Sequence, residues 1–417
     1  MMKNWRKKGG RSWRLVSGVG ASAALAMAFS AFGATPPTFA AGQAPITIGV
    51  SASLTGDFSS SGIPLEQGYK LWENYVNSHG GILGRKVKII FLNDNSSTSQ
   101  VATNYEDLIT RDKVDIVFGP YSSLLTVPAL EIADRYGYAF EAPAGGGPAV
   151  FALKSPNFVF VQPTPVSDTM VSFAKWILSL PKSERPTTAA YATEDGPFSP
   201  AMLQTARNIL QSHGIKTVYD KIYPTETTDF LPMVLGIEHS KAQIVLLGTH
   251  EPEAADYVRD FVQQHYNPKA IVFTGGPEDG TEFLDGIGGA KYANGIMVPG
   301  GWWYGEPSYQ NKLFVSMYVK TYGGKPTDVP TTAAEAFSVG QVFQQAAEHV
   351  HSINNAKIIK ALHTYTFNTV QGPMKFNAQG AANGEDFLMQ WQHGKLEVVY
   401  PNSIKTAAPL FPKPNWP

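Results

Sequence analysis

Two kinds of hydrophobic pattern alternate along the chain from about residue 46 onward. Short runs rich in apolar residues, of which Ile46–Leu54 and Arg85–Asp94 are the first two, are typical of strands buried inside a sheet. Longer segments follow in which apolar residues recur at helical spacing, as they do in residues 65–76. This alternation predicts β-α units, and therefore an α/β fold with parallel sheets that are covered by helices on both faces.

The alternation runs through the chain twice, with a restart after Phe158–Asp168. We therefore predict two Rossmann-like lobes, each with its own sheet. The predicted strands are 46–54, 85–94, 114–118 and 138–141 in the first series, and 187–193, 215–223, 242–248, 269–275 and 294–300 in the second. Three late helices are predicted at 309–322, 331–350 and 356–364, and a terminal hairpin is predicted to turn at His393-Gly394.

The first forty residues differ from the rest of the chain. Six basic residues stand within the first 14 positions, an uncharged apolar stretch follows at residues 15–33, and small residues lead to Ala40. This order is typical of a secretory signal peptide that is cleaved near Ala40. A membrane anchor is the alternative, since a run of roughly 19 apolar residues nearly spans a bilayer. The small residues and the cleavage-like end favour the signal peptide, and with it export to the periplasm or the cell-wall space.

Composition narrows the possible functions. The 417 residues are 43% hydrophobic, which is enough for the cores of two or three domains. Without residues 1–40, 33 − 6 = 27 Lys and Arg remain against 34 Asp and Glu, a net charge of −7 that argues against nucleic acid as a partner. There are no cysteines, so disulfides, thiol catalysis, Cys-ligated zinc and a lipid-modified cysteine anchor are all excluded.

Four loops that follow predicted strands are rich in glycine and small polar residues. They lie at 53–62, 119–123, 141–151 and 193–200. Ligands of open parallel sheets bind beyond the carboxyl ends of the strands, where free N–H groups of helix N-termini can hold a carboxylate. In the second loop Ser122 or Ser123 would add a hydroxyl donor, although a serine there can simply cap the following helix. Considered alone, this loop favours the interpretation that its serine caps a helix. Four such loops, divided between two lobes, favour a ligand site.

Catalytic motifs are missing from the sequence. There is no G-x-S-x-G nucleophile elbow, no phosphate-binding P-loop, and no G-x-G-x-x-G after a strand. The string "HEPEA" at 250–254 lacks the second histidine of a zinc-protease motif, and the two histidines of Glu348–His351 are spaced to fall on different sides of a helix. We therefore expect a protein without catalytic residues, metal site or cofactor.

Several strings of the chain resemble one known family. They are "IGVSASLTGDFSSSG", "VNSHGGILGRKVKIIFLND", "DIVFGPYSS", "GTHEPEA" and "GGPEDG", and the most specific is N-x-x-GGI-x-GRK at Asn77–Lys86. From Ile46 to Tyr400 the chain resembles the periplasmic branched-chain amino-acid binding proteins of ABC importers, which have the type I solute-binding fold. The resemblance implies an exported clamp that captures a small organic solute and delivers it to a membrane ABC permease.

The same resemblance implies how the lobes are divided. The amino-terminal lobe would hold residues 44–162 and 301–372, and the carboxy-terminal lobe 163–300 and 373–417. Three hinge strands would join them near Val161–Val166, Met297–Gly301 and Gly372–Phe376. Such a protein is expected to act as a monomer.

In the amino-terminal lobe the resemblance implies a site for the ligand's carboxylate. Ser123 and Ala144 match two family positions that hold this group, with Ser122 and Gly145 beside them. A family threonine is replaced by Gly146, so that one hydroxyl is missing and an N–H remains.

In the other lobe the family's aromatic ring is kept at Phe198, without a hydroxyl. Glu278 is the candidate partner for a ligand ammonium, and a family tyrosine is replaced by His250 or Glu251. A first-loop aromatic of the family is replaced near Ser61. Trp303, in "GGWWYG", would either line the cleft or pack between the lobes.

A branched-chain or other aliphatic amino acid is the default ligand. The replacements at Ser61, Gly146 and Phe198 leave room for an amide or an aromatic carboxylate. A ligand sensor that uses the same clamp, and an enzyme on an α/β scaffold, are the alternatives from other classes. Neither an output domain nor a nucleophile, metal or cofactor motif supports them.

Overall fold

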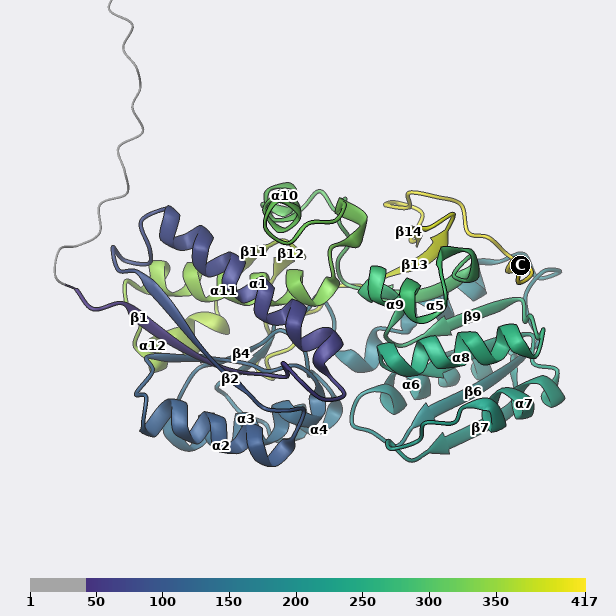
Figure 1. Ribbon diagram of the computed structural model, residues 1–417, viewed down its shortest axis with the longest axis horizontal. Helices are drawn as coiled ribbons and strands as arrows, with labels where there is room; N and C mark the ends of the chain where they lie inside the picture. Colours follow the sequence, from purple (N-terminus) through teal and green to yellow (C-terminus); the bar gives the residue numbers. More distant parts are fainter. Residues whose placement is uncertain (1–42) are drawn as a thin grey trace, which may run out of the picture. The chain divides into compact units, whose positions relative to one another are not determined.

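The first strand series forms a five-stranded parallel sheet in the computed structural model, which describes residues 43–417 (Figure 1). The predicted signal peptide at residues 1–40 lies outside the described residues. The strand order is β2-β1-β3-β4-β5, and Ile46 pairs with Val87 at the start of the sheet. The bounds are β1 (Ile46–Ala52), β2 (Val87–Asn93), β3 (Ile116–Phe118), β4 (Phe140–Ala142) and β5 (Phe158–Phe160).

Helices from both ends of the sequence cover this sheet. One face packs against α2 (Thr98–Thr110) and α3 (Ser123–Tyr136), with α4 (Pro148–Ala152) beside them. The other face packs against α1 (Ser59–Ser78) and the late helix α11 (Thr331–Val350), which lie side by side in Figure 1. The core on this face therefore combines residues 46–161 with residues 302–382. The remaining late helices are α10 (Asn311–Tyr322) and α12 (Asn355–Leu362). We call the first sheet with these helices the first lobe.

The second series forms a seven-stranded sheet of order β14-β13-β10-β9-β8-β6-β7. Its first five strands in the sequence run parallel, and the terminal hairpin adds two antiparallel strands next to β10. The bounds are β6 (Thr188–Glu194), β7 (Lys216–Tyr223), β8 (Ile244–Gly248), β9 (Ala270–Phe273), β10 (Ile296–Gly300), β13 (Phe387–Gln392) and β14 (Lys395–Tyr400). His393 and Gly394 both have positive φ, so the predicted tight turn between β13 and β14 is confirmed.

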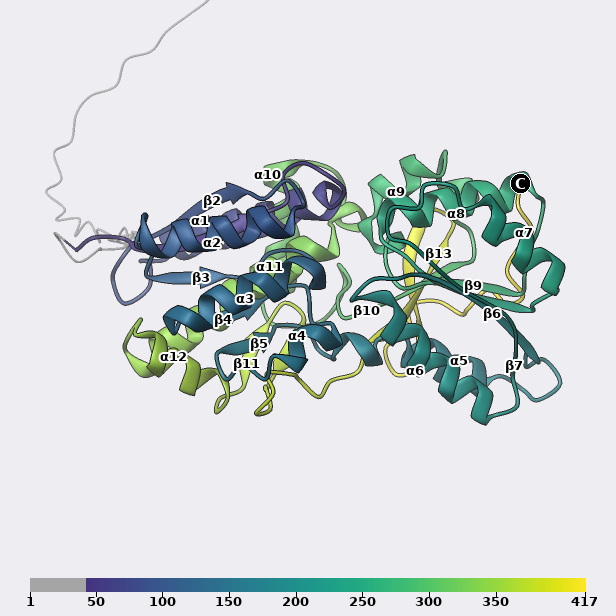
Figure 2. The same cartoon turned by 90° about the horizontal axis from the view of Figure 1, so that it is seen from below.

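Helices also lie on both faces of the second sheet (Figure 2). One face carries α5 (Val171–Ser179) and α6 (Ser199–Ser212). The opposite face carries α7 (Leu231–Ser240), α8 (Glu251–Gln263) and α9 (Thr281–Gly286). We call this sheet with its helices the second lobe. The fold is thus α/β with two layered sheets, as the alternation predicts. No helix in the range 43–417 has both the length and the apolar character needed to cross a membrane.

Three chain segments cross between the sheets and meet at Pro163. Gly384 N donates to the Pro163 carbonyl at 2.7 Å. A Cβ on Gly301 would lie 2.7 Å from Pro163 Cδ, and one on Gly384 would lie 2.6 Å from the Pro163 carbonyl oxygen. The three backbones therefore approach one another more closely than a side chain would allow.

The third crossing differs from the predicted one at Gly372–Phe376. That segment contains β12 (Gly372–Met374), which pairs with β11 (Phe367–Thr369) as a short hairpin. Met374 and Phe376 are buried in the apolar core of the first lobe, where the Phe376 ring packs against Phe367. The chain joins the second sheet only at Phe387, the start of β13.

Candidate ligand-binding site

Two neighbouring cavities lie at the carboxyl ends of the parallel strands. The inner cavity has a volume of about 100 Å³ and the outer cavity about 610 Å³. The inner cavity is lined by Tyr121, Ala144, Gly145, Phe160, Gln162, Thr164, Val166, Thr169, Phe198, Met202, Thr274, Glu278, Pro299, Gly300, Gly301, Thr331, Thr332, Glu335 and Asp386. Phe198 lines both cavities, and residues of both lobes contribute to each of them.

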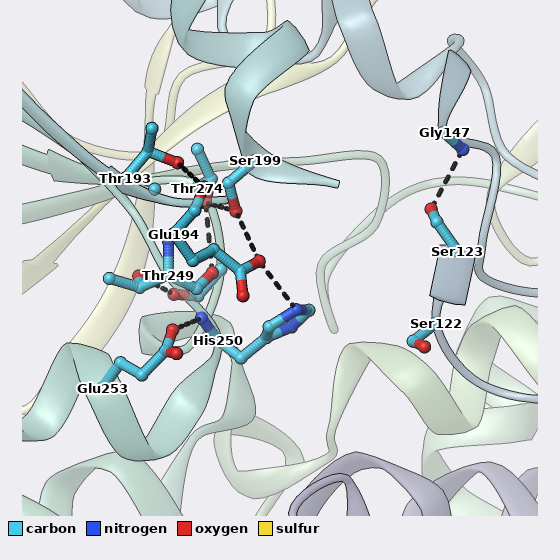
Figure 3. A network of polar contacts seen from close by, with 12 residues as sticks. Ser122, Ser123, Gly147, Thr193, Glu194, Ser199, Thr249, His250, Glu253 and Thr274 are labelled. Carbon is cyan, nitrogen blue, oxygen red and sulfur yellow. Dashed lines mark hydrogen bonds and ion pairs between the residues drawn. The ribbon is translucent and has the colours of Figure 1, made fainter. Parts of the chain in front are cut away.

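The outer cavity is lined by two serines of the first lobe and by one histidine of the second. Ser122 and Ser123 reach it from the first lobe, and His250 reaches it from the second. Figure 3 shows the His250 ring projecting from the strand ends of the second lobe, with Ser122 and Ser123 opposite. Around His250, the side chains of Glu194, Ser199, Glu253 and Thr274 and the backbone of Thr249 form one hydrogen-bonded network.

The two serines of the loop after β3 have different roles. Ser122 is the N-cap of α3, and its hydroxyl oxygen accepts from Leu125 N at 3.4 Å. Ser123 Oγ accepts from Gly147 N at 3.0 Å, which ties this loop to the loop after β4 (Figure 3). Because a hydroxyl that accepts one bond still carries its hydrogen, Ser123 can also donate to a ligand. Ser122 therefore caps the helix, and the neighbouring Ser123 can donate a hydrogen bond to a ligand.

The glycine-rich loop after β4 reaches the inner cavity only in part. Ala144 and Gly145 line it, and Gly146 does not. A Cβ on Gly146 would lie 2.5 Å from Cδ1 of Phe160, so the phenyl ring occupies the space that a threonine side chain would need. Glycine at position 146 therefore has two effects. It removes the hydroxyl of the family threonine, and it leaves the space in which the Phe160 ring forms part of the cavity wall.

His250 is held from several sides. Its N–H donates to Glu253 Oε2 at 2.8 Å, as the N-cap residue of α8. Its ring stacks on Phe198 with 5.0 Å between centroids and 20° between planes. Nε2 lies 3.4 Å from Glu194 Oε1.

The carboxylates around His250 control its charge. Burial lowers its pKa, but the hydrogen bond and charge of Glu194, together with the charges of Glu253 and Glu278, outweigh burial and raise the pKa above the ordinary value. The imidazole therefore carries a proton more readily than a free histidine.

Glu278 lies in the short 3-10 helix Pro277–Asp279 and lines the inner cavity. Burial raises its pKa to about 7, partly opposed by backbone N–H donors. Its Oε2 atom is buried and has no hydrogen-bond partner among the described residues. A carboxyl oxygen is thus available where the resemblance implied an ammonium partner.

Ser61 and Trp303 do not line either cavity. Ser61 is buried in the first turn of α1, and its hydroxyl lies 3.5 Å from Asp279 Oδ2 of the second lobe. Trp303 packs with residues of β13 and β14, and it lines a separate small pocket that also contains Glu278. Of the two interpretations of Trp303, packing fits this position.

The structure adds lining residues that sequence reasoning missed. No motif marks them: Tyr121 lies in the loop after β3, Phe160 ends β5, Thr274 follows β9, and the others stand in α11 or on crossing segments. They are Tyr121, Phe160, Gln162, Thr164, Thr274, Thr331, Thr332, Glu335 and Asp386. The available signal was position: Tyr121 lies in the predicted ligand loop 119–123, and Gln162 and Thr164 lie inside the predicted first hinge strand, 161–166.

The protein has two α/β lobes, and polar loops of both lobes line shared cavities. This is the architecture of a two-lobed solute-binding protein. A family model described as periplasmic binding protein matches residues 45–395. The chain belongs to this family, whose members are extracytoplasmic solute-binding proteins.

Curated relatives match along nearly the whole chain. A protein named Leu/Ile/Val-binding protein homolog 8 from Brucella suis is 23% identical over 415 residues, covering 95% of this chain and 98% of the relative. Leu/Ile/Val-binding protein homolog 7 from the same organism is 22% identical over 406 residues, covering 94% of this chain and 98% of the relative.

Solved structures show the same fold. The branched-chain amino acid transporter substrate-binding protein LivJ from Streptococcus pneumoniae, in complex with isoleucine, is similar with a TM-score of 0.75 and 20% identity, covering 86% of this chain and 100% of that one. A solute-binding protein of an ABC transporter from R. palustris, in complex with benzoate, has a TM-score of 0.75 and 16% identity, covering 89% and 97%. The type I solute-binding fold is therefore confirmed.

Proposed function

We propose that the protein captures a small organic solute by closure of its two lobes and delivers it to a membrane ABC permease. The observation that carries this proposal is the inner cavity, which residues of both lobes line at their strand ends. Contacts made from both sides stabilise a closed arrangement over an open one, which is how a ligand shifts a two-state equilibrium. The protein would act as an exported monomer, with its signal peptide cleaved near Ala40, and would bind and release its ligand unchanged.

The two lobes offer complementary chemistry to one ligand. The first lobe presents Ala144 and Gly145 to the inner cavity and the Ser123 hydroxyl to the outer cavity, where either can receive a carboxylate or an amide carbonyl. The second presents Glu278, with one unpaired carboxyl oxygen, to an ammonium group. An amino acid satisfies both ends and is the ligand class we propose. An aromatic carboxylate is the second candidate, since Phe160 and Phe198 line the cavity and one solved neighbour holds benzoate.

The packing supports a modified division of the lobes. We propose 44–162 with 301–382 for the first lobe, because Met374, Phe376 and Ala382 lie in its core. The second lobe would be 163–300 with 383–417. The three crossing segments at Pro163 would act as the hinge.

A thermal-shift screen followed by calorimetry tests the proposal. Purified protein is titrated with isoleucine, leucine, aliphatic amides and benzoate, and a true ligand raises Tm in a concentration-dependent way. Small-angle X-ray scattering with the same ligand should show a smaller radius of gyration. Absence of any stabilising solute across amino acids, amines, amides and aromatic acids would overturn the proposal.

The Glu278→Gln variant separates the two ligand classes. It should lose at least tenfold in affinity for an amino acid and much less for the deaminated analogue, since the amide no longer offers a negative charge to the ammonium. Glu282→Gln, on the exposed side of α9, is the matched control. Equal losses for both compounds would remove Glu278 from this role.

A further inference from the structure

Three carboxyl side chains line the inner cavity, and they come from three different elements. Glu278 lies in the 3-10 helix after β9, Glu335 in the second turn of α11, and Asp386 immediately before β13. Among the residues that line this cavity, none is Lys, Arg or His. In the proposed function Glu278 pairs with the ammonium group of an amino acid. Glu335 and Asp386 then have no assigned partner on the ligand.

Glu335 is close enough to the other two carboxyls to be affected by the charge of each. Its pKa is raised to about 8: burial is the main cause, a hydrogen bond with Gln162 opposes it, and the charges of Glu278 and Asp386 add to it. Burial likewise raises the pKa of Asp386 to about 8, opposed by a hydrogen bond with Thr169. A cation close to these groups would favour their ionised forms.

A fourth polar group in the same wall also lacks a partner. The Thr332 side chain is 6% exposed and lines the inner cavity, and its Oγ1 atom has no hydrogen-bond partner among the described residues. Buried polar atoms in native proteins are nearly always hydrogen-bonded, and an unmade bond is costly. An N–H group of a ligand that reached Glu335 would supply the donor this hydroxyl oxygen lacks.

The remaining walls suit an organic cation. Tyr121, Phe160 and Phe198 line the cavity, and aromatic ring faces attract ammonium and guanidinium groups. Within residues 43–417 no three His, Cys, Asp or Glu side chains stand close enough together to hold a metal ion. The cavity thus offers an organic cation both carboxyl groups and aromatic rings.

We propose that the ligand carries two cationic nitrogens, as in a diamine or a diamino acid, with Glu278 at one nitrogen and Glu335 with Asp386 at the other. This inference rests on the proposed function and specifies the ligand class of the same site. It predicts that affinity depends on the second nitrogen more than on an apolar side chain.

Calorimetric titration of the purified protein with 1,5-diaminopentane, lysine and leucine provides the test. We expect at least one of the two diamino compounds to bind tenfold or more tightly than leucine. The double variant Glu335→Gln/Asp386→Asn should lose that preference. Glu306→Gln is the control, because Glu306 is a half-buried carboxyl whose pKa burial likewise raises to about 8, but it lies outside the inner cavity. It should keep the wild-type preference.

Proton release gives a readout that needs no variant. Binding of a dication should expel protons from the cavity carboxyls at pH 7, so the observed heat should differ between phosphate and Tris buffers. Leucine binding without diamine or lysine binding would overturn this inference and leave the proposed function standing. Failure of every amino acid, amine, amide and aromatic acid to bind would overturn both. A diamine preference that survives in the double variant would also contradict the assignment of Glu335 and Asp386.

Discussion

The hydroxyl of Tyr121 lies 3.4 Å from Nδ1 of His250, and this contact connects the loop after β3 in the first lobe with the start of α8 in the second. Phe58 extends the contact, with its ring centroid 5.8 Å from Tyr121 and 5.4 Å from His250. Phe198 stacks on the other side of the imidazole. A small aromatic cluster therefore joins the two lobes beside the cavities.

Removal of the Tyr121 hydroxyl should weaken ligand binding, because it loosens the contact between the lobes. Tyr121→Phe keeps the ring and deletes a hydrogen bond worth about 1 kcal/mol, so the closed state loses population and affinity should fall roughly three- to tenfold. Calorimetry with the identified ligand checks this. Tyr138→Phe is the control, since its hydroxyl bonds to Val114 O within the first lobe. An equal affinity loss in both variants would contradict the prediction.

The pair of His250 and Glu194 should make stability depend on pH. The folded-state pKa of His250 is raised, so the pair's contribution is fully present below about pH 6.5, the ordinary histidine value, and is lost as pH rises through the raised pKa. The groups that face this ring are Glu194, Glu253, Glu278 and Tyr121.

Melting curves of wild type and Glu194→Gln between pH 5.5 and 8.5 measure this effect. The difference in Tm should be largest at the acid end and should shrink toward pH 8.5. A difference that grows with pH would show that His250 is neutral in the folded protein.

Glu141 should make the protein less stable as pH rises. It lies on β4, both carboxyl oxygens are buried without partners among the described residues, and burial raises its pKa to about 8. The folded state keeps this proton between the unfolded pKa and pH 8, so unfolding free energy falls across that window by at most about 1.4 kcal/mol per pH unit.

Urea unfolding at pH 6 and pH 8.5 tests the Glu141 prediction. Glu141→Gln should increase stability at pH 6 and increase it more at pH 8.5, because the cost of holding the proton accumulates from the unfolded pKa upward. Glu131→Gln, at an exposed site on α3, should show no such pH-dependent gain. If the glutamine variant were less stable at both pH values, an unrecognised partner of the carboxylate would be indicated.

Gly146→Ala should destabilise the protein by roughly 1–3 kcal/mol, because the new methyl group meets the Phe160 ring in a packed wall. Ligand affinity should fall as the ring is pushed into the inner cavity. Phe160→Leu in the same chain should restore much of the stability. Differential scanning calorimetry checks both steps; a neutral single variant would contradict the packing.

The sequence predicts the layered fold well and the cavity only partly. Alternating patterns mark each strand, because buried parallel strands and amphipathic helices have different periods. Ser123 and Glu278 were accessible to sequence reasoning since they follow strands. Glu335 and Asp386 were not, because they reach the cavity from a late helix and from the chain's last crossing, and only the tertiary fold brings them together.

The placement of two further segments depends on tertiary packing and could not be predicted from the sequence. Trp303 lies against the β13–β14 hairpin, which is distant in sequence and provides the apolar surface of Met389 and Val398. The segment 372–376 reads as a crossing strand by its place in the chain, yet Met374 and Phe376 are held by the first lobe's core.

The meeting of three backbones at Pro163 has a consequence for how such a protein evolves. Gly301 and Gly384 contact Pro163 from two separate crossings, so a side chain at either position would change how easily the lobes part while the cavity walls keep their composition. In the proposed clamp, the residence time of the ligand and the choice of ligand are thus encoded in different parts of the sequence. Selection for faster unloading at a transporter can act on these glycines and leave chemical preference as it was.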